Sequence, residues 1–264
     1  MPDALNTAAL GMSAQQKMVD NIANNIANVN TTGFKRSTIA FQDLFYKTIA
    51  TSREGLAADG SNGGTAELQI GHGSRPVATI RNFSEGSVDQ TGNPLDMCIN
   101  GDGFFQVEMP DGSIAYTRDG NFSLNSSGEI VNESGLPLAS RISVPQDAVG
   151  IKISQNGVVT AELSGGKGQV NLGQIELAKF VNNIGLKAMG GNLYTSTTAS
   201  GEPFLGDPGD QGFGSIQQGY LEHSNVDIVN EMVKLIEAQR AYETNSKMVH
   251  TAEQMMSVTN AIKQ

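Results

Sequence analysis

Residues 21–34 read NIANNIANVNTTGF, a stretch that carries no charged side chain. Asn21, Asn24, Asn25 and Asn28 fall at helical spacing beside an apolar stripe. A helix face that meets only water usually carries Lys and Glu, which favour helices more than Asn does. Neutral amides suit a face buried against other chains, because they hydrogen-bond there without the desolvation cost of a charge. The stretch indicates assembly, with a solvated helix face as the alternative.

The same stretch ends a predicted N-terminal helix over about residues 3–32, roughly 45 Å long at 1.5 Å per residue. Apolar or small residues recur every seven positions in two rows offset by three and four, which is the pattern of a coiled-coil seam. Gly33 is placed to adopt the left-handed conformation that ends a helix. The rows are Leu5, Met12, Val19 and Ile26, and Ala8, Gln15, Ile22 and Val29.

A second long helix is predicted at the C-terminal end. No Gly or Pro follows Gly219, so the helix is expected to run to the last residues, over roughly 55 to 60 Å. Ser224 with Asp227 three positions later resembles a capping box and places the helix start at Ser224. The apolar rows are Ile228, Leu235, Tyr242, Val249 and Met256, and Ala241, Met248, Met255 and Ile262.

The region between these helices holds 29 of the 31 Gly and seven of the eight Pro. Short alternating runs separated by turn residues predict β-hairpins at Asp111-Gly112, Asp119-Gly120 and Ser127-Gly128, and again over residues 150–172. Residues 51–66 are Gly-rich with little apolar content, which predicts a loop. The fold class is therefore α+β, with terminal helices around a mainly β insert.

Composition argues against several classes of protein. The net charge is -10 and the pI about 4.7, which disfavours a nucleic-acid binder. Because the chain has one cysteine, it has no intramolecular disulfide. No apolar run is long enough for a membrane span or a signal peptide, so we expect an unprocessed chain that is not embedded in a membrane.

Motifs for chemistry are also missing from the sequence. The three His residues have no zinc-ligand spacing, Gly166-Lys167 lacks both the first Gly and the Ser or Thr of a phosphate loop, and no G-x-S-x-G elbow is present. Asp207 and Asp210 are too few for a calcium site. Cys98 lies in an apolar run and is expected to be a small buried residue. We expect no catalytic residue, metal or cofactor.

Three stretches resemble one family closely. They are NNIANVNTTGFKR at residues 24–36, TGNPLDMCINGDGFFQV at 91–107 with YTRDGNF at 116–122, and GYLEHSNVDIVNEMVKLIEAQRAYETNSKMV at 219–249. Together they resemble the rod and hook axial proteins of the bacterial flagellum. The order of the motifs, the FQDLFY run at 41–46 and the extended loop before IGHGSRP at 70–76 are most similar to the branch that builds the distal rod.

The resemblance implies a structural subunit, not an enzyme, which polymerises helically into the drive shaft of the basal body. Its implied partners are other copies of itself, the proximal rod proteins, the hook protein, the P-ring and L-ring proteins and the flagellar type III export apparatus, which would export it without a cleaved signal. The implied domains are an N-terminal inner helix at 1–33, a linking region with an extended loop at 34–75, an outer β-rich domain at 76–220 and a C-terminal inner helix at 221–264.

The family's assembly roles map onto two groups of residues. The first is expected to pack the terminal helices together, and the second to reach neighbouring subunits through polar contacts. The helix-pairing residues are Leu5, Met12, Val19, Ile22, Ile26, Val29, Ile228, Leu235, Tyr242, Val249 and Met256. The inter-subunit residues are Asn24, Asn25, Asn28, Gln239, Arg240 and Asn245.

Two alternatives remain at this point. The first is a sibling of the same family, a proximal rod or hook protein, from which the segment of about Ala50 to Gly73 separates this chain. The second, from a different class, is a secreted carbohydrate-active enzyme built on the β-rich insert, although no pair of catalytic carboxylates can be identified.

Overall fold

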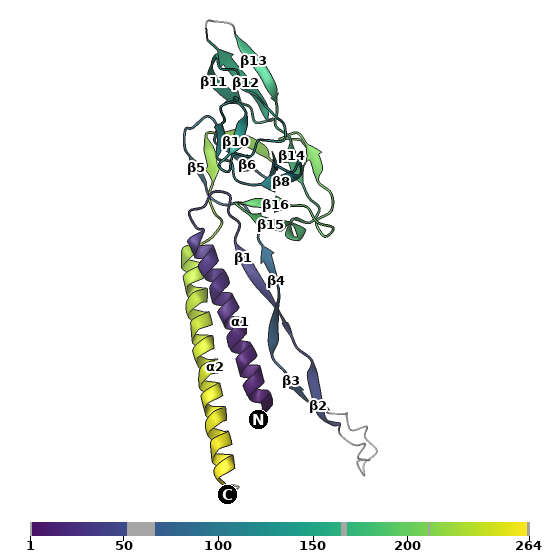
Figure 1. The fold of residues 1–264 in the computed structure, drawn as a ribbon, viewed down its shortest axis with the longest axis vertical. Helices are drawn as coiled ribbons and strands as arrows, with labels where there is room; N and C mark the ends of the chain where they lie inside the picture. Colours follow the sequence, from purple (N-terminus) through teal and green to yellow (C-terminus); the bar gives the residue numbers. More distant parts are fainter. Residues whose placement is uncertain (1, 52–66, 165–167, 211, 263–264) are drawn as a thin grey trace, which may run out of the picture. The chain divides into compact units, whose positions relative to one another are not determined.

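The computed structural model describes residues 2–51, 67–164, 168–210 and 212–262. Helix α1 (Pro2–Ala27) opens the chain and helix α2 (Ile228–Ile262) closes it, with short strands between them (Figure 1). This confirms the predicted α+β class. The chain divides into two compact units: unit 1 comprises residues 1–25, 37–80 and 228–264, and unit 2 comprises residues 26–36 and 81–227. The loop predicted at residues 51–66 lies, apart from its first residue, outside the described residues.

Unit 1 contains the two helices, which run antiparallel, and two pairs of strands (Figure 1). Strand β1 (Ser37–Asp43) pairs with β4 (Ser74–Arg81), whose last residue begins unit 2. Strand β2 (Tyr46–Thr51) pairs antiparallel with β3 (Glu67–Gly71), and a register shift falls between Thr48 and Ala50. Most of the described residues of the predicted linking region at 34–75 therefore lie in paired strands.

Helix α1 ends at Ala27, five residues before the predicted end at Thr32. The next residues form turns, in which the Val29 N–H donates to the Ile26 carbonyl at 3.2 Å. Asn and β-branched residues fill this stretch, and both are weak helix formers that leave a helix easily. Gly33 has the expected positive φ of 65°, but its N–H donates to the Glu222 carbonyl at 2.8 Å and not to the helix.

Helix α2 begins at Ile228, so the predicted start at Ser224 was wrong. Residues 223–227 are irregular, and the Ser224 hydroxyl accepts a hydrogen bond from the Val226 N–H at 3.3 Å. Asp227, which precedes the first helical residue, occupies the N-cap position that Asp favours. The helix continues to Ile262, in agreement with the absence of Gly and Pro from this part of the sequence.

Unit 2 is a set of short antiparallel strands in several small sheets. Its C-terminal strands return to its N-terminal ones, because β18 pairs with β6 and β19 with β5. Its other groups are the sheet β15-β16-β8-β7, the hairpin β9-β10, the meander β11-β12-β13 and the pair β14-β17. The strands are β5 (Val88–Gln90), β6 (Met97–Asn100), β7 (Phe105–Glu108), β8 (Ile114–Thr117), β9 (Phe122–Leu124), β10 (Ile130–Asn132), β11 (Ala148–Ile153), β12 (Val158–Leu163), β13 (Gln169–Gln174), β14 (Leu177–Lys179), β15 (Lys187–Gly190), β16 (Leu193–Thr195), β17 (Phe204–Gly206), β18 (Ser215–Gln218) and β19 (Tyr220–Glu222), with a 3₁₀ turn at Asn183–Gly185.

Most predicted hairpins are confirmed. Asp111-Gly112 lies in the turn between β7 and β8, Ser127-Gly128 lies between β9 and β10, and residues 150–172 fall within the meander. Asp119-Gly120 does not close a hairpin, because β8 and β9 pair with different strands. The Gly120 carbonyl instead accepts a hydrogen bond from the Met97 N–H at 3.0 Å, and a Cβ at Gly120 would collide with the Met97 backbone.

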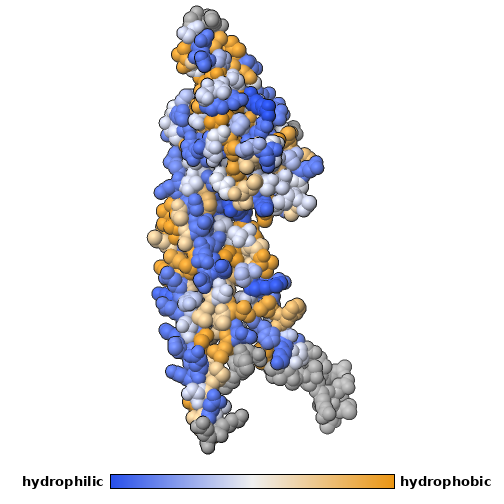
Figure 2. Space-filling view, in the orientation of Figure 1, coloured by the Kyte–Doolittle hydropathy of each residue, from blue (hydrophilic) through white to orange (hydrophobic). Residues whose placement is uncertain are grey.

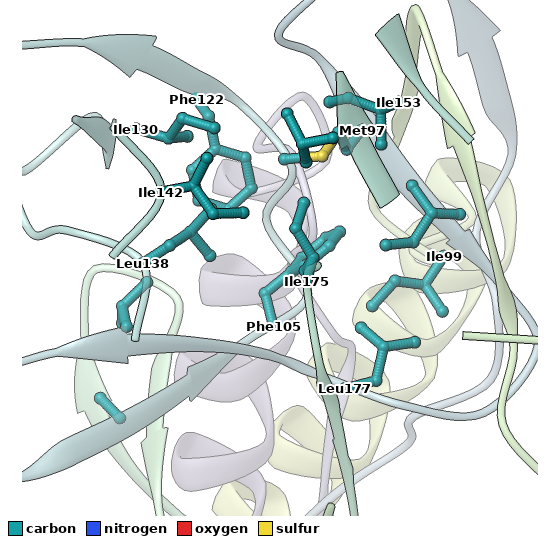
Figure 3. Packing of buried hydrophobic residues seen from close by; sticks show 14 of the residues in the cluster. Met97, Ile99, Phe105, Phe122, Ile130, Leu138, Ile142, Ile153, Ile175 and Leu177 are labelled. Carbon is teal, nitrogen blue, oxygen red and sulfur yellow. The ribbon is translucent and has the colours of Figure 1, made fainter. Parts of the chain in front are cut away.

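The core of unit 2 is apolar. Side chains from β6, β7, β9, β10 and the meander meet in one cluster, shown in Figure 3. A second cluster is aromatic, with the Tyr116 and Phe180 rings 4.8 Å apart in edge-to-face geometry. Cys98 is fully buried beside these clusters, as expected, and burial raises the pKa of its thiol to about 11.

Candidate assembly interface

Two amides on α1 hold the start of β1. Asn25 Nδ2 and Asn21 Nδ2 both donate to the Ser37 carbonyl at 2.8 Å. In return, Asn25 Oδ1 accepts from the Ser37 N–H at 3.0 Å, and Asn21 Oδ1 accepts from the Ser37 hydroxyl at 2.7 Å. Every polar group of Ser37 is therefore satisfied by two Asn side chains one helical turn apart, which fixes the first residue of β1 beside the last turns of α1.

The Asn25 amide also joins the two helices. Its Nδ2 donates to Glu231 Oε2 at 3.0 Å, and both side chains are buried, with exposures of 0% and 2%. The other oxygen of Glu231 accepts from Lys234 at 3.0 Å. Glu231 lies in the first turn of α2, where the helix dipole favours a carboxylate. A buried polar contact thus fixes the pairing of α1 with α2 at this end.

Small residues allow the helices to approach closely along the rest of the pair. Ala8 and Ala14 on α1 and Ala238 and Ala252 on α2 are buried. A Cβ on Gly11 would lie 2.9 Å from Asn245 Nδ2, which shows how near the two backbones are. On α2 the buried residues repeat every seven positions, as in a coiled coil, but the row is polar and small. The row is Glu231, Ala238, Asn245 and Ala252, with Asn245 partly buried.

The helix-pairing residues expected on α2 flank this row. Leu235, Val249 and Met256 are partly buried, whereas Ile228 and Tyr242 are 43% and 45% exposed. On α1, Ile22 is buried and Leu5, Met12 and Val19 are partly buried. Ile26 and Val29 are partly buried within the segment that belongs to unit 2. The role of these side chains in assembly stays a prediction.

The residues expected to reach neighbouring subunits fall into two groups. Asn24, Gln239 and Arg240 are exposed on the helices. Asn25 and Asn245 face the seam, where Asn25 makes the contacts described above and Asn245 lies against Gly11, and Asn28 is partly buried in the turn after α1. The amides of the Asn-rich stretch thus bind within the chain at Asn21 and Asn25.

A shallow groove lies between the two helices. It has a volume of about 430 Å³ and is lined by Gln16 and Val19 on α1 and by Gln239, Tyr242 and Glu243 on α2. Apolar side chains are also exposed elsewhere in unit 1, on α2 and on the paired strands, and Figure 2 shows such hydrophobic surface among hydrophilic side chains. Phe45, between β1 and β2, is 90% exposed. A surface of this kind marks sites of association with other protein.

In unit 2 a buried cluster of charges surrounds Glu222. Lys35 Nζ donates to Glu222 Oε1 at 2.5 Å and to the Ser84 carbonyl at 2.7 Å, and Arg118 NH1 lies 3.5 Å from Glu222 Oε2. Burial lowers the pKa of Lys35, and the charge of Glu222 opposes that change. No local sequence pattern predicts this cluster, because Lys35, Arg118 and Glu222 are far apart along the chain.

The described residues offer little for chemistry. Among them there is no group of three or more His, Cys, Asp or Glu side chains arranged to hold a metal ion. Within the described ranges, neither helix is long and apolar enough to cross a membrane. The features that stand out are the exposed apolar helix surface, which suits association with other protein, and the buried polar contacts, which hold the chain's own elements together.

Comparisons with known proteins match three parts of the chain. Residues 5–35 match the family described as flagella basal body rod protein, residues 98–161 match the flagellar hook protein FlgE/F/G D1 domain, and residues 217–262 match the C-terminal part of the flagellar basal body rod FlgEFG proteins. These regions comprise most of α1 and α2 and much of the unit 2 core.

Relatives match over nearly the whole length. The flagellar basal-body rod protein FlgG of Caulobacter vibrioides is 46% identical over 260 residues, covering 98% of this chain and 99% of the relative. FlgG of Borreliella burgdorferi is 44% identical over 265 residues, covering 100% and 99%. FlgF of Caulobacter vibrioides is 34% identical over 256 residues, covering 94% of each chain. The chain therefore belongs to the FlgG family of flagellar basal-body rod proteins, which are structural subunits of the rod and not enzymes.

Proposed function

We propose that copies of this chain stack helically into the distal rod and transmit motor torque from the proximal rod to the hook. The observation that carries the proposal is the helix pair of unit 1, which exposes apolar side chains on the outside of α2 in a chain that aligns with FlgG relatives end to end. Covering that surface with further copies removes it from water, which favours polymerisation.

The α1–α2 pair fits this role physically. The fully buried residues on the α2 side of the seam are small or polar, so burial between the two helices supplies less apolar stabilisation than a Leu-rich seam would. Contacts with neighbouring copies would supply the remainder. We propose that the helices at 1–33 and 221–264 form the inner domain of the polymer and that residues 76–220 form its outer domain, joined by the linking region at 34–75.

The partners follow from the position of a distal rod. We propose contacts with the proximal rod proteins at one end and with the hook protein at the other, rotation within the P-ring and L-ring proteins, and delivery by the flagellar type III export apparatus without a cleaved signal. Support for these partners comes from the family resemblance and not from contacts within this chain.

The test is deletion of the gene in the cell that makes this chain, followed by electron microscopy of the basal bodies. We expect rods that stop at their proximal part, no hooks and no motility, with all three restored when the chain is supplied again. Hooks of normal length on full rods without the chain would contradict the proposal.

A sibling role in the proximal rod is the second candidate. It is disfavoured because FlgF of Caulobacter vibrioides is 34% identical to this chain whereas FlgG of the same bacterium is 46% identical. A peptide tag inserted in the exposed β7–β8 turn at Asp111 would separate the two roles by gold labelling. Label on the rod segment next to the hook supports the distal role, and label confined to the motor-side segment supports the sibling role. A carbohydrate-active enzyme is no longer a candidate, since the family is structural.

A further inference from the structure

The outer face of α2 has apolar side chains near both of its ends. Near the start, the head patch consists of Met232, Val233 and Ile236, each 50% to 53% exposed. Near the end, the tail patch consists of Met255, Val258 and Ile262, which are 48%, 58% and 80% exposed. Successive residues of each patch are one, three or four positions apart, so their side chains lie on one side of the helix and form a short stripe.

The outer face between the two patches is mainly polar, and its exposed apolar exception is Met248, 56% exposed, seven residues before Met255. Arg240, Glu243, Lys247 and His250 are exposed there and, at 100° per residue, point in the same general direction as the patches. A neighbour that covered α2 along its whole length would bury these charges, which is costly without partners. The pattern therefore favours separate contacts at the two ends of the helix.

The tail patch lies beyond the end of α1. Asn25 of α1 contacts Glu231 of α2, and Gly11, fourteen residues before Asn25, lies against Asn245, fourteen residues after Glu231. Continuing in the same register, Pro2 at the start of α1 is level with Gln254 of α2. Residues 255–262 thus extend past α1, and residues 254–262 carry no charged side chain. Within the described part of the chain, α1 does not cover this stretch.

The electrostatics of the two ends are complementary. The head patch lies in the first three turns of α2, at the positive end of the helix dipole, and the tail patch lies in its last turns, at the negative end. Beside the head patch, Glu231 and Lys234 neutralise each other through a 3.0 Å ion pair. Because residues 254–262 carry no charged side chain, packing them on the head patch adds no side-chain charge to the contact.

We propose that the tail patch of one subunit packs on the head patch of a second copy of this chain, with the two α2 helices side by side and parallel. The contact joins different surfaces of the two copies and displaces each copy along the helix direction, so it does not close into a ring and propagates as an open polymer. This inference rests on the proposed rod function and specifies which surfaces join along the polymer.

The proposal fixes a distance. The centres of the two patches are separated by about 25 residues along α2, which at 1.5 Å per residue is about 37 Å. Contacting subunits are therefore displaced by about 37 Å along the helix direction, and their α2 helices overlap over roughly ten residues.

Cysteine cross-linking in assembled rods tests the contact. The chain's single cysteine, Cys98, is buried, so the background is low. In the Val233→Cys/Val258→Cys double variant, oxidation should link each subunit to the next and give a ladder of dimers, trimers and higher multimers. The matched control, Val233→Cys/Glu243→Cys, pairs the head patch with the polar middle and should give no ladder. Either single variant alone should stay monomeric on a denaturing gel.

The outcomes separate the contact from the rod function, because rod assembly is scored independently by hooks and motility. A ladder confined to the first pair supports the proposal. The proposed contact is overturned if rods assemble and cells are motile but the first pair gives no ladder. An equal ladder in the control, or dimers from Val258→Cys alone, also overturns the contact. In each of these cases the rod function still stands.

A second pair of variants covers the case in which the cysteine pair fails to assemble. Val258→Asp should abolish hooks and motility, and Val233→Lys added to it should restore them by placing a cation opposite the new carboxylate. Normal motility of Val258→Asp, or loss that the second substitution does not reverse, overturns the proposed contact.

Discussion

The Nζ atom of Lys35 lies 2.5 Å from Oε1 of Glu222, and both side chains are buried within unit 2. The Lys35 segment precedes β1 and Glu222 ends β19, so the contact joins residues from opposite ends of the chain. The Gly86 N–H also donates to Glu222 Oε1 at 3.0 Å, and Arg118 approaches the other oxygen. Glu222 thus serves as the shared counter-charge of two buried cations.

Glu222→Gln should strongly destabilise unit 2. The substitution keeps the size of the side chain but leaves Lys35 and Arg118 buried without an anion. Removing one partner from a buried ion pair costs about 3–5 kcal/mol. Denaturant unfolding of the full chain, followed by a probe of the β-rich unit such as tyrosine fluorescence, measures the loss.

Glu202→Gln is the matched control for Glu222→Gln, because Glu202 is exposed in the same unit and the change in net charge is identical. It should alter the free energy of unfolding by less than about 0.5 kcal/mol. Equal effects of the two substitutions would show that the ion cluster does not hold unit 2 together.

Asn25→Asp should weaken the α1–α2 pair. The amide nitrogen that now donates to Glu231 and to the Ser37 carbonyl would become a carboxylate oxygen, which repels both acceptors in a buried site. We expect a loss of at least about 2 kcal/mol in the stability of the helices. Thermal melting followed by circular dichroism at 222 nm, where helix dominates, reports it.

Asn24→Asp provides the comparison at the neighbouring, exposed position. It introduces the same charge on the same turn of α1, and the melting temperature should stay close to that of the native chain. If Asn24→Asp were as harmful as Asn25→Asp, the added charge and not the buried contact would be responsible.

Leu235→Asp should disrupt the flank of the helix seam and prevent assembly. Leu235 is partly buried beside the buried row on α2, so a carboxylate there loses solvation without gaining a partner. We expect about 1–3 kcal/mol of destabilisation in the monomer and no rods beyond the proximal part in cells. Thr244→Asp, at an exposed position of the same helix, should assemble normally. Motile cells carrying Leu235→Asp would exclude this part of the seam from assembly.

Asp119 gives unit 2 a specific pH dependence. Burial raises the pKa of its carboxyl above the ordinary 3.8, although hydrogen bonds from the Asn121 N–H and the Thr32 hydroxyl act in the opposite direction. Between 3.8 and the raised value the folded state binds more protons than the unfolded state, so the contribution of Asp119 to stability falls as pH rises through that window.

Asp119→Asn removes this titration and retains an oxygen that accepts the same hydrogen bonds. The difference in unfolding free energy between the native chain and the variant should therefore decrease as pH rises from about 4, and become constant above the folded pKa. Urea unfolding of both proteins across this range measures it. A difference that does not change with pH would show that Asp119 titrates at its ordinary pKa.

Much of the fold was predictable because its signals are local. Heptad spacing predicted both helices, and Gly-containing turns predicted the β7–β8 and β9–β10 hairpins. The helix ends were less accurate. Asn28 to Thr32 can follow helical spacing in the sequence, but the chain after Ala27 forms turns closed by local hydrogen bonds. The bond from the Gly33 N–H to the Glu222 carbonyl depends on a residue far along the chain.

The site was harder to predict for the same reason. Apolar spacing predicted an α2 seam of Ile228, Leu235, Tyr242, Val249 and Met256. The residues that the structure buries fully on α2 are instead small or polar, such as Ala238 and Glu231. A small residue in a seam matters only once the partner helix approaches, which a single sequence does not reveal. The pairing of Asn25 with Glu231 likewise joins residues that no short-range rule connects.

The measurement that tests the account most directly is a helical reconstruction by electron cryomicroscopy of rods purified from the cells that make this chain. The account predicts a polymer in which the α1–α2 pairs form the inner layer, with the end of each α2 packed on the start of another α2 displaced by about 37 Å along the helix direction. A rod whose inner layer contains no helix pair of this chain, or in which α2 faces solvent along its whole length, would contradict it.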